Sequence, residues 1–258
     1  MSKAPTERFS DRVENYILYR PGYPPEVLEL LRAECRLEPE HVIADIASGT
    51  GALTRLLLEN GNPVIAVEPN AEMREAGARL LASYSKLTSV AGTAEETTLP
   101  AAAVDFVTAA QAAHWFDRQM ARQEFARILK PGGWCLLIWN ERRTASTPFL
   151  RDYEQLLLTY STDYQEVRHE KTTATIAEFF APTPCQERVF EYRQRVDYEG
   201  AAGRLLSSSY APLEGHPSRA PMMAELQRIF RAYAQLGMVE FEYDTRVFYG
   251  NLGEVNYL

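Results

Sequence analysis

Long hydrophobic runs are missing from this sequence of 258 residues. A membrane-spanning helix needs roughly 18 or more uninterrupted apolar residues, and no stretch approaches that length. The first residues, MSKAPTERFSDR, also lack the apolar stretch of a signal peptide. We therefore expect a cytoplasmic protein with no membrane partner.

Cysteine is scarce. Cys35, Cys135 and Cys185 are widely separated and form no CxxC pair. This pattern favours neither a disulfide framework nor a zinc site. We expect no bound metal, and nothing in the sequence indicates the oligomeric state.

An excess of basic charge is absent as well. The 27 Lys and Arg residues are outnumbered by 35 Asp and Glu residues, which leaves a formal net charge of −8. Because nucleic-acid affinity depends largely on Lys and Arg neutralising phosphates, we expect no nucleic-acid partner. A small-molecule substrate becomes the default expectation.

Apolar residues make up 46% of the chain, enough for a sizeable core. Short β-branched runs alternate with longer segments of helical period; the runs are VIADI, PVIAV, VDFVTAA and WCLLIW. This alternation predicts a doubly wound α/β fold, with a mostly parallel sheet covered by helices on both faces. The later segments ERVFEYRQRV and VEFEYDTRVFYG read as strands, and the last of them could lie antiparallel.

A glycine loop follows the first predicted strand. Gly49 and Gly51 let the backbone turn tightly and come close to a ligand. A dinucleotide fingerprint would need a third glycine where Thr54 stands, which weakens a nicotinamide oxidoreductase interpretation. Asp45 adds negative charge, which disfavours a pyrophosphate but favours a cationic amino group or sulfonium. S-adenosylmethionine carries both groups.

An acid, Glu68, follows the second predicted strand at the edge where ligands bind in open α/β sheets. Its two carboxylate oxygens can hold both hydroxyls of a ribose. The alternative is an acid at a helix start, since Asn70 could cap a helix beginning near Ala71. The spacing from the glycine loop favours ribose binding.

With this loop and this acid, the sequence resembles the class I S-adenosylmethionine-dependent methyltransferases. Within that family it is similar to the type 11 and trans-aconitate methyltransferase-like group. The usual loop of that family reads D-x-G-x-G-x-G, and this sequence has Ala47 at the first glycine. The resemblance covers nearly the whole chain. It implies a cofactor site around Asp45. In that site the ribose hydroxyls would bind Glu68, and Pro69 and Met73 would border the adenine. The methionine and ribose would be lined by the loop residues Ala47, Ser48, Gly49, Thr50 and Gly51.

Two later segments extend the resemblance. AGTAE at residues 91–95 resembles the G-D-A-E segment of that group. Thr93 stands in place of the aspartate that accepts a hydrogen bond from the adenine amino group there. The resemblance implies adenine contact by Thr93 and Ala94, with Glu95 beside them, whereas a plain turn is the alternative. QAAHWFD at residues 111–117 is similar to a signature beside the transferred methyl group. It implies cofactor contacts by Gln111, Ala112 and Trp115.

His114 lies in this second segment and is a candidate general base, because histidine titrates near neutral pH. An orienting or structural role is the alternative. A carboxylate acceptor would need no base, since the reaction is an in-line displacement on an already activated methyl group. Trp115 and Phe116 could face the cationic centre or belong to the core.

An N-terminal segment matches the lid pattern Y-x-x-x-R-P-x-Y-P of the group, with Tyr16 as a second catalytic candidate. Arg20 could pair with the methionine carboxylate of the cofactor or with an acidic substrate. Alternatively, Arg20 ties the lid to the core. Ser207 to Tyr210 is similar to a segment that faces the substrate pocket in such enzymes.

We therefore predict a Rossmann-like sheet of seven strands with one antiparallel strand, in a single methyltransferase domain over residues 1–258. Its expected parts are a lid (1–40), a cofactor-binding core (41–146), a helical cap (147–219), and a helix and strand completing the sheet (220–258). The predicted reaction transfers a methyl group to a small molecule, on a carboxylate or hydroxyl. Alternatives are methylation of tRNA or another macromolecule, and a non-catalytic module that binds S-adenosylmethionine.

Overall fold

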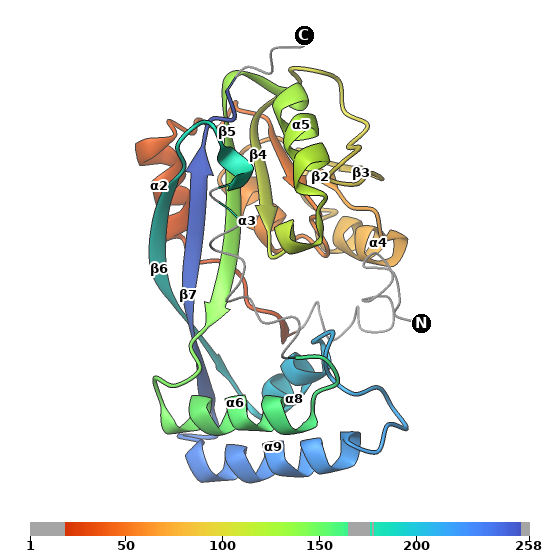
Figure 1. Cartoon of the computed structure of the whole chain (residues 1–258), viewed down its shortest axis with the longest axis vertical. Helices are drawn as coiled ribbons and strands as arrows, with labels where there is room; N and C mark the ends of the chain where they lie inside the picture. The colour runs from red at the N-terminus through yellow and green to blue at the C-terminus, as the bar shows by residue number, and fades with distance from the viewer. Residues whose placement is uncertain (1–18, 165–175, 177, 254–258) are drawn as a thin grey trace.

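A computed structural model describes residues 19–164, 176 and 178–253. It contains a seven-stranded sheet with the order β3-β2-β1-β4-β5-β7-β6 (Figure 1). The strands are β1 (Ile43–Ile46), β2 (Val64–Val67), β3 (Leu87–Val90), β4 (Val104–Ala110), β5 (Leu129–Arg142), β6 (Gln186–Val196) and β7 (Val239–Gly250). The helices are α2 (Glu26–Glu34), α3 (Ala52–Glu59), α4 (Ala71–Leu80), α5 (Arg118–Ile128), α6 (Pro148–Tyr160), α8 (Tyr198–Leu206) and α9 (Arg219–Tyr233), with a short 3-10 helix η3 (Ala113–Trp115).

Only the direction of β7 departs from a parallel sheet. Strands β1 to β5 pair in parallel, and β7 pairs antiparallel with both β5 and β6. The predicted fold, mostly parallel with one reversed strand, is confirmed. The strand order reverses at β1, where β2 lies on one side and β4 on the other, so a ligand crevice is expected at the carboxyl ends of these strands.

Helices cover both faces of the sheet because successive strand residues point to opposite sides. Ile43 of β1 packs with α2 and α3, whereas the next residue, Ala44, packs with Phe125 and Ile128 of α5. All four residues of β1 are buried. The near-continuous apolar runs of the sequence reflect this burial on two sides.

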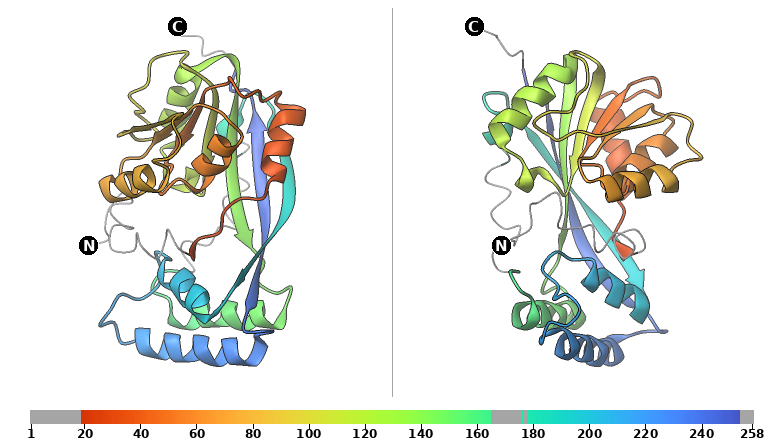
Figure 2. Two further views of the ribbon diagram at one scale, coloured as in Figure 1. Left: turned by 180° about the vertical axis from the view of Figure 1, so that it is seen from behind. Right: turned by 90° about the vertical axis from the view of Figure 1, so that its right-hand side faces the viewer.

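The long strands β5, β6 and β7 extend beyond the rest of the sheet and reach a separate helical layer made of α6, α8 and α9 (Figures 1 and 2). The layer packs around an aromatic cluster that includes Phe149, Tyr153, Phe241 and Tyr243. The stretch 147–219, expected as a helical cap, also supplies β6, because β6 pairs with β7 along its full length from Gln186 to Val196. The carboxyl end of β5 points towards the helical layer (Figure 1).

The described residues contain neither membrane helices nor a metal centre. None of their helices is long and apolar enough to cross a membrane. Their His, Cys, Asp and Glu side chains form no group of three that could hold a metal ion.

Candidate functional site

The predicted ligand-binding segments come together at one edge of the sheet. The last residue of β1, Ile46, is in register with Val67 of β2 and Ala109 of β4, and Val67 is in register with Val90 of β3. These strands therefore end at nearly the same level. The segments that follow them, 47–51, 68–73, 93–95 and 111–115, all start from this carboxyl edge.

The glycine loop between β1 and α3 is held in left-handed backbone conformations. Gly49 has φ +58° and Gly51 has φ +87°, values that favour glycine. A Cβ on Gly51 would lie 2.5 Å from Cδ1 of Leu81, so a side chain there would also force the Leu81 side chain to move. A Cβ on Gly77 of α4 would lie 3.2 Å from the Gly49 carbonyl oxygen, which shows that α4 packs closely against the loop. Sequence reasoning missed Gly77.

Ala47 occupies the first glycine position of the motif with φ +53°. A left-handed conformation costs a residue with a Cβ about 1 kcal/mol or more. Ala47→Gly is therefore expected to raise the free energy of unfolding by about 0.5–1 kcal/mol, after allowing for the greater entropy of glycine in the unfolded chain. Urea unfolding measures the difference.

The matched control is Ala52→Gly, at an exposed position in the first turn of α3. There the backbone is helical, so the same substitution should lower stability by up to about 1 kcal/mol. An unchanged or lower stability of Ala47→Gly would show that the loop is not strained at this residue.

Glu68 turns back towards the glycine loop from the end of β2. Its Oε2 accepts the N–H of Gly49 at 2.8 Å, and its Oε1 accepts the N–H of Asn70 at 2.9 Å. Burial raises the pKa of Glu68, and the two N–H groups and Arg74 oppose this rise. Each carboxylate oxygen can accept a second hydrogen bond, so two acceptor positions remain, as a pair of neighbouring hydroxyls would require.

Asn70 caps α4, since its Oδ1 accepts the N–H of Met73 at 2.8 Å. The capping role considered in the sequence is therefore present, and Asn70 performs it. Met73 is buried, and the methyl carbon of its side chain lies 3.5 Å from the position of a Cβ on Gly49. Pro69, between Glu68 and Asn70, is half-buried.

Asp45 lies beneath the glycine loop and is 1% exposed. Its Oδ2 accepts the hydroxyl of Thr54 in α3 at 2.6 Å, and its Oδ1 accepts the hydroxyl of Thr108 in β4 at 2.9 Å. Burial raises the pKa of Asp45 to about 6, while the two hydroxyls act in the opposite direction. Asp45 thus holds α3 and β4 against the end of β1. Sequence reasoning used Thr54 only as a missing glycine and did not identify Thr108.

Thr93 and Glu95 have local partners in the structure. The Thr93 hydroxyl accepts the N–H of Glu96 at 3.1 Å and closes a turn after β3. Glu95 accepts the N–H of Asp117 at 2.9 Å, which joins this turn to the start of α5. Ala94 is buried in the core. The adenine contacts of this segment stay a prediction.

The segment after β4 begins with a strained residue. Gln111 has φ +58°, and its N–H donates to the carbonyl of Ile138 at 2.8 Å. Such conformations cost about 1–3 kcal/mol and cluster at functional sites. Ala112 is buried, whereas His114 in η3 is exposed with its ring 4.5 Å from that of Trp115. A catalytic role of His114 stays a prediction.

Residues 19–24 form a strap between the core and the helical layer. Arg20 Nη2 donates to the Ser207 carbonyl at 3.2 Å, Gln194 Nε2 donates to the Tyr19 carbonyl at 3.1 Å, and Asn140 Nδ2 donates to the Gly22 carbonyl at 2.8 Å. The contact to Ser207 agrees with the alternative in which Arg20 ties the lid to the rest of the protein. Tyr16 lies outside the described residues.

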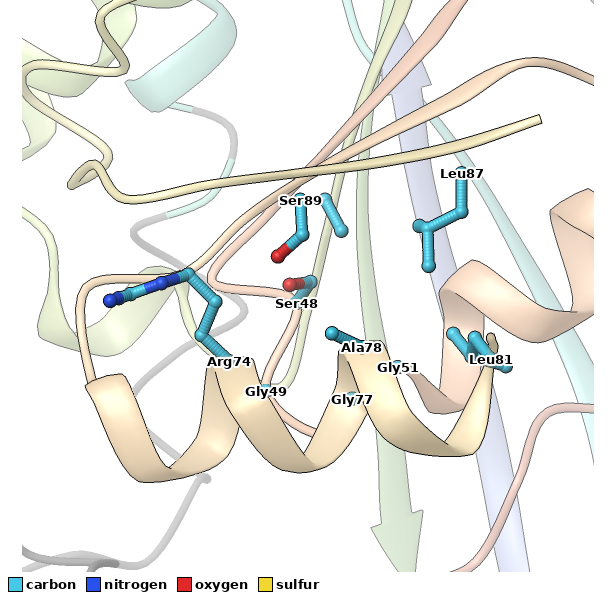
Figure 3. A pocket seen from close by; sticks show the side chains of 10 residues that line it. Ser48, Gly49, Gly51, Arg74, Gly77, Ala78, Leu81, Leu87 and Ser89 are labelled. Carbon is cyan, nitrogen blue, oxygen red and sulfur yellow. The ribbon is translucent and has the colours of Figure 1, made fainter. Parts of the chain in front are cut away.

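A hollow lies between α4 and the strands β2 and β3 (Figure 3). Its lining includes Ser48, Gly49 and Gly51 from the loop, but neither Asp45 nor Glu68. The polar residues of this lining are Ser48, Arg74 and Ser89, whereas the buried carboxylates of Asp45 and Glu68 lie at the carboxyl edge of the sheet. We therefore assign the candidate site to that edge and not to the hollow.

The core of the chain is similar in sequence to known methyltransferases. Residues 44–137 match a family described as a methyltransferase domain. An uncharacterized methyltransferase of Mycobacterium tuberculosis is 42% identical over 135 residues, which cover 52% of this chain and 52% of that protein. An uncharacterized methyltransferase of Schizosaccharomyces pombe is 33% identical over 150 residues, or 58% of each chain. The matched region thus spans little more than half the length of these relatives.

Solved structures share the fold over more of the chain. An Anaeromyxobacter dehalogenans protein provisionally named a type II methyltransferase has a TM-score of 0.68 and 21% identity, covering 92% of this chain and 100% of that one. Haemonchus contortus phosphoethanolamine N-methyltransferase 2, solved with phosphomonomethylethanolamine and S-adenosylhomocysteine, has a TM-score of 0.55 and 15% identity, covering 93% of this chain and 56% of that one. At these identities the likeness establishes the fold.

Proposed function

We propose that this chain, whose residues 44–137 match a methyltransferase domain, is a class I S-adenosylmethionine-dependent methyltransferase that transfers a methyl group to a small molecule. The leading acceptor atom is an oxygen of a carboxylate or hydroxyl. The observation that carries the proposal is the arrangement of Glu68, whose two oxygens each accept one backbone N–H beside the glycine loop.

The residues at the carboxyl edge fit S-adenosylmethionine. Glu68 retains an acceptor position on each oxygen for the two ribose hydroxyls. Gly49 leaves room for close approach to the backbone, and the ionised form of Asp45 beneath the loop favours a cationic ligand. The bound cofactor would supply a methyl group activated by its sulfonium. The chain itself would align the acceptor and exclude water.

We infer that the acceptor binds on the side of the carboxyl edge that faces the helical layer (Figure 1). A carboxylate acceptor is already nucleophilic and needs no base, which is compatible with the exposed position of His114. The net charge of −8 supports a small-molecule acceptor over a nucleic acid. We also propose that the enzyme works in the cytoplasm without a membrane partner.

Calorimetry with S-adenosylmethionine, S-adenosylhomocysteine and NADH tests the cofactor assignment. We expect binding of the first two and none of NADH; binding of NADH alone would overturn the proposal. A second experiment incubates the protein with methyl-labelled cofactor and a panel of acids and phenols. Transfer of label to a panel member is the expected result, and cofactor binding without any transfer would identify a non-catalytic module instead.

A further inference from the structure

Asn140 is a buried residue near the end of β5, with 7% of its surface exposed. Ala110, the last residue of β4, is in register with Ile138, so Asn140 lies two residues beyond the end of β4. The side chains of Ile138 and Asn140 point to the same face of the sheet, because successive strand residues alternate. Ile138 packs with α2 and α3 on that face. Asn140 therefore lies at the carboxyl edge of the candidate site, on the face where α2 and the strap before it lie.

The two ends of the Asn140 amide bind different parts of the chain. Its Oδ1 accepts the hydroxyl of Thr245 in β7 at 2.7 Å, and its Nδ2 donates to the Gly22 carbonyl of the strap at 2.8 Å. Thr245 is fully buried. A threonine hydroxyl can donate or accept, whereas a carbonyl oxygen only accepts. The Gly22 carbonyl therefore determines which way the amide points, and a carboxylate in place of the amide would have no proton to donate to it.

The main chain around Asn140 holds the turn that follows β4. The Asn140 carbonyl accepts Gln111 Nε2 at 3.4 Å, and the Ile138 carbonyl accepts the Gln111 N–H at 2.8 Å. The left-handed conformation of Gln111, with φ +58°, persists only where the surrounding structure holds it. Asn140 thus joins the strap, through its side chain, to the start of the segment 111–115, through its main chain.

The strap also follows the long strands of the sheet. Gln194 Nε2 of β6 donates to the Tyr19 carbonyl at 3.1 Å, and a Cβ on Gly22 would lie 3.8 Å from the hydroxyl oxygen of Tyr192 in β6. Figure 2 shows the chain before α2 running from that helix towards the helical layer. These contacts hold the strap against β6. The bond from Asn140 is the one that brings Gly22 to β5, the strand beside β4.

We propose that Asn140 is a positioning residue for cofactor binding, because its side chain docks the strap on the carboxyl edge beside the segment 111–115. This inference rests on the proposed methyltransferase function and adds a residue that acts through the strap. Docking removes conformational freedom from the strap, and the hydrogen bond to Gly22 offsets part of that cost before the cofactor binds. A chain whose strap is docked for a smaller fraction of the time binds its ligand more weakly in proportion to that fraction.

Asn140→Asp tests this role, because it removes the donor and keeps the shape of the side chain. At pH 7.5 the introduced carboxylate faces the Gly22 carbonyl, so the strap should leave the edge. Calorimetry should show about 10-fold weaker binding of S-adenosylhomocysteine than in the wild type. Hydrogen exchange of residues 19–24, measured without ligand, should be faster than in the wild type.

The pH dependence of the affinity separates positioning from a general loss of stability. At about pH 5 the introduced carboxyl should be protonated, because burial raises the pKa of an acid, and it can then donate to Gly22 again. The affinity of Asn140→Asp should therefore approach that of the wild type as the pH falls. The two proteins are compared at each pH, because burial also raises the pKa of Asp45 and of Glu68 at the same edge.

The matched control is Asn62→Asp. Asn62 is fully buried, and its Nδ2 donates to the carbonyls of Glu38 and His41. These residues precede β1 and β2, so they lie at the amino edge of the sheet, opposite the candidate site. The same change there should lower stability, while the folded variant keeps the cofactor affinity of the wild type at each pH.

The inference is wrong if Asn140→Asp binds S-adenosylhomocysteine as tightly as the wild type, if exchange of the strap is unchanged, or if low pH does not restore the affinity. If Asn140→Asp does not fold, Thr245→Val removes the hydroxyl that holds the amide, and it should cause a smaller loss of affinity and faster exchange of the strap. Failure of the wild type to bind S-adenosylhomocysteine would contradict the methyltransferase function separately, because exchange of the strap is measured without ligand.

Discussion

Replacement of Glu68 by glutamine is expected to weaken S-adenosylmethionine binding about 100-fold. The carboxylate accepts the N–H groups of Gly49 and Asn70, one on each oxygen. A glutamine has only one acceptor atom, so its amide nitrogen would face one of these donors and could not accept from a ribose hydroxyl. Loss of charge-assisted hydrogen bonds worth about 3 kcal/mol in total corresponds to about two orders of magnitude in affinity.

The matched control is Glu75→Gln, in which an exposed acid of α4 changes in the same way. Calorimetry on both variants and circular dichroism of the folded proteins separate a binding effect from unfolding. If Glu68→Gln bound the cofactor as tightly as Glu75→Gln, Glu68 would not contact the ribose, and its role would be limited to holding the loop.

Asp45→Asn is expected to stabilise the protein at neutral pH while weakening cofactor binding. Burial raises the pKa of Asp45 from 3.8 to about 6, so the folded chain binds this proton more tightly than the unfolded chain. The stability contributed by the protonated group is complete below about pH 4 and is lost as the pH rises to about 6. The loss corresponds to about 3 kcal/mol. Asparagine stays neutral and avoids it, since the Thr54 and Thr108 hydroxyls can each donate or accept.

Urea unfolding between pH 4 and pH 7.5 measures this effect. The free energy of unfolding of Asp45→Asn should exceed that of the wild type by an amount that grows as the pH rises. The variant should also lose more affinity for S-adenosylmethionine than for S-adenosylhomocysteine, because only the former carries the sulfonium charge. Asp105→Asn is the control of opposite sign, since Lys130 and the Val42 N–H help hold the pKa of Asp105 below its ordinary value. If the free energy of unfolding changed with pH in the same way for wild type and Asp45→Asn, the pKa of Asp45 would not be raised in the folded protein.

Local sequence pattern predicted most of the fold. The β-branched runs became β1, β2, β4 and β5, and the two alternating segments after them became β6 and β7. A strand pattern does not specify its partner, however, because period-two alternation is the same at the edge or the centre of a sheet. The placement of β6 at the edge depends on β7, whose twelve residues offer a pairing surface that reaches into the helical layer.

The glycine loop and the position of Glu68 after the second strand could be predicted without the structure, because both follow from residue types over short distances along the chain. The contacts that these groups make depend on how the elements pack. Asp45 meets the hydroxyl of Thr108, which is 63 residues away, and Arg204 meets that of Tyr243, which is 39 residues away. Such pairs form when packed elements bring distant side chains together, and nothing in the local pattern of either residue indicates its partner. The same packing left Arg204 buried against the hydroxyls of Tyr243 and Tyr153.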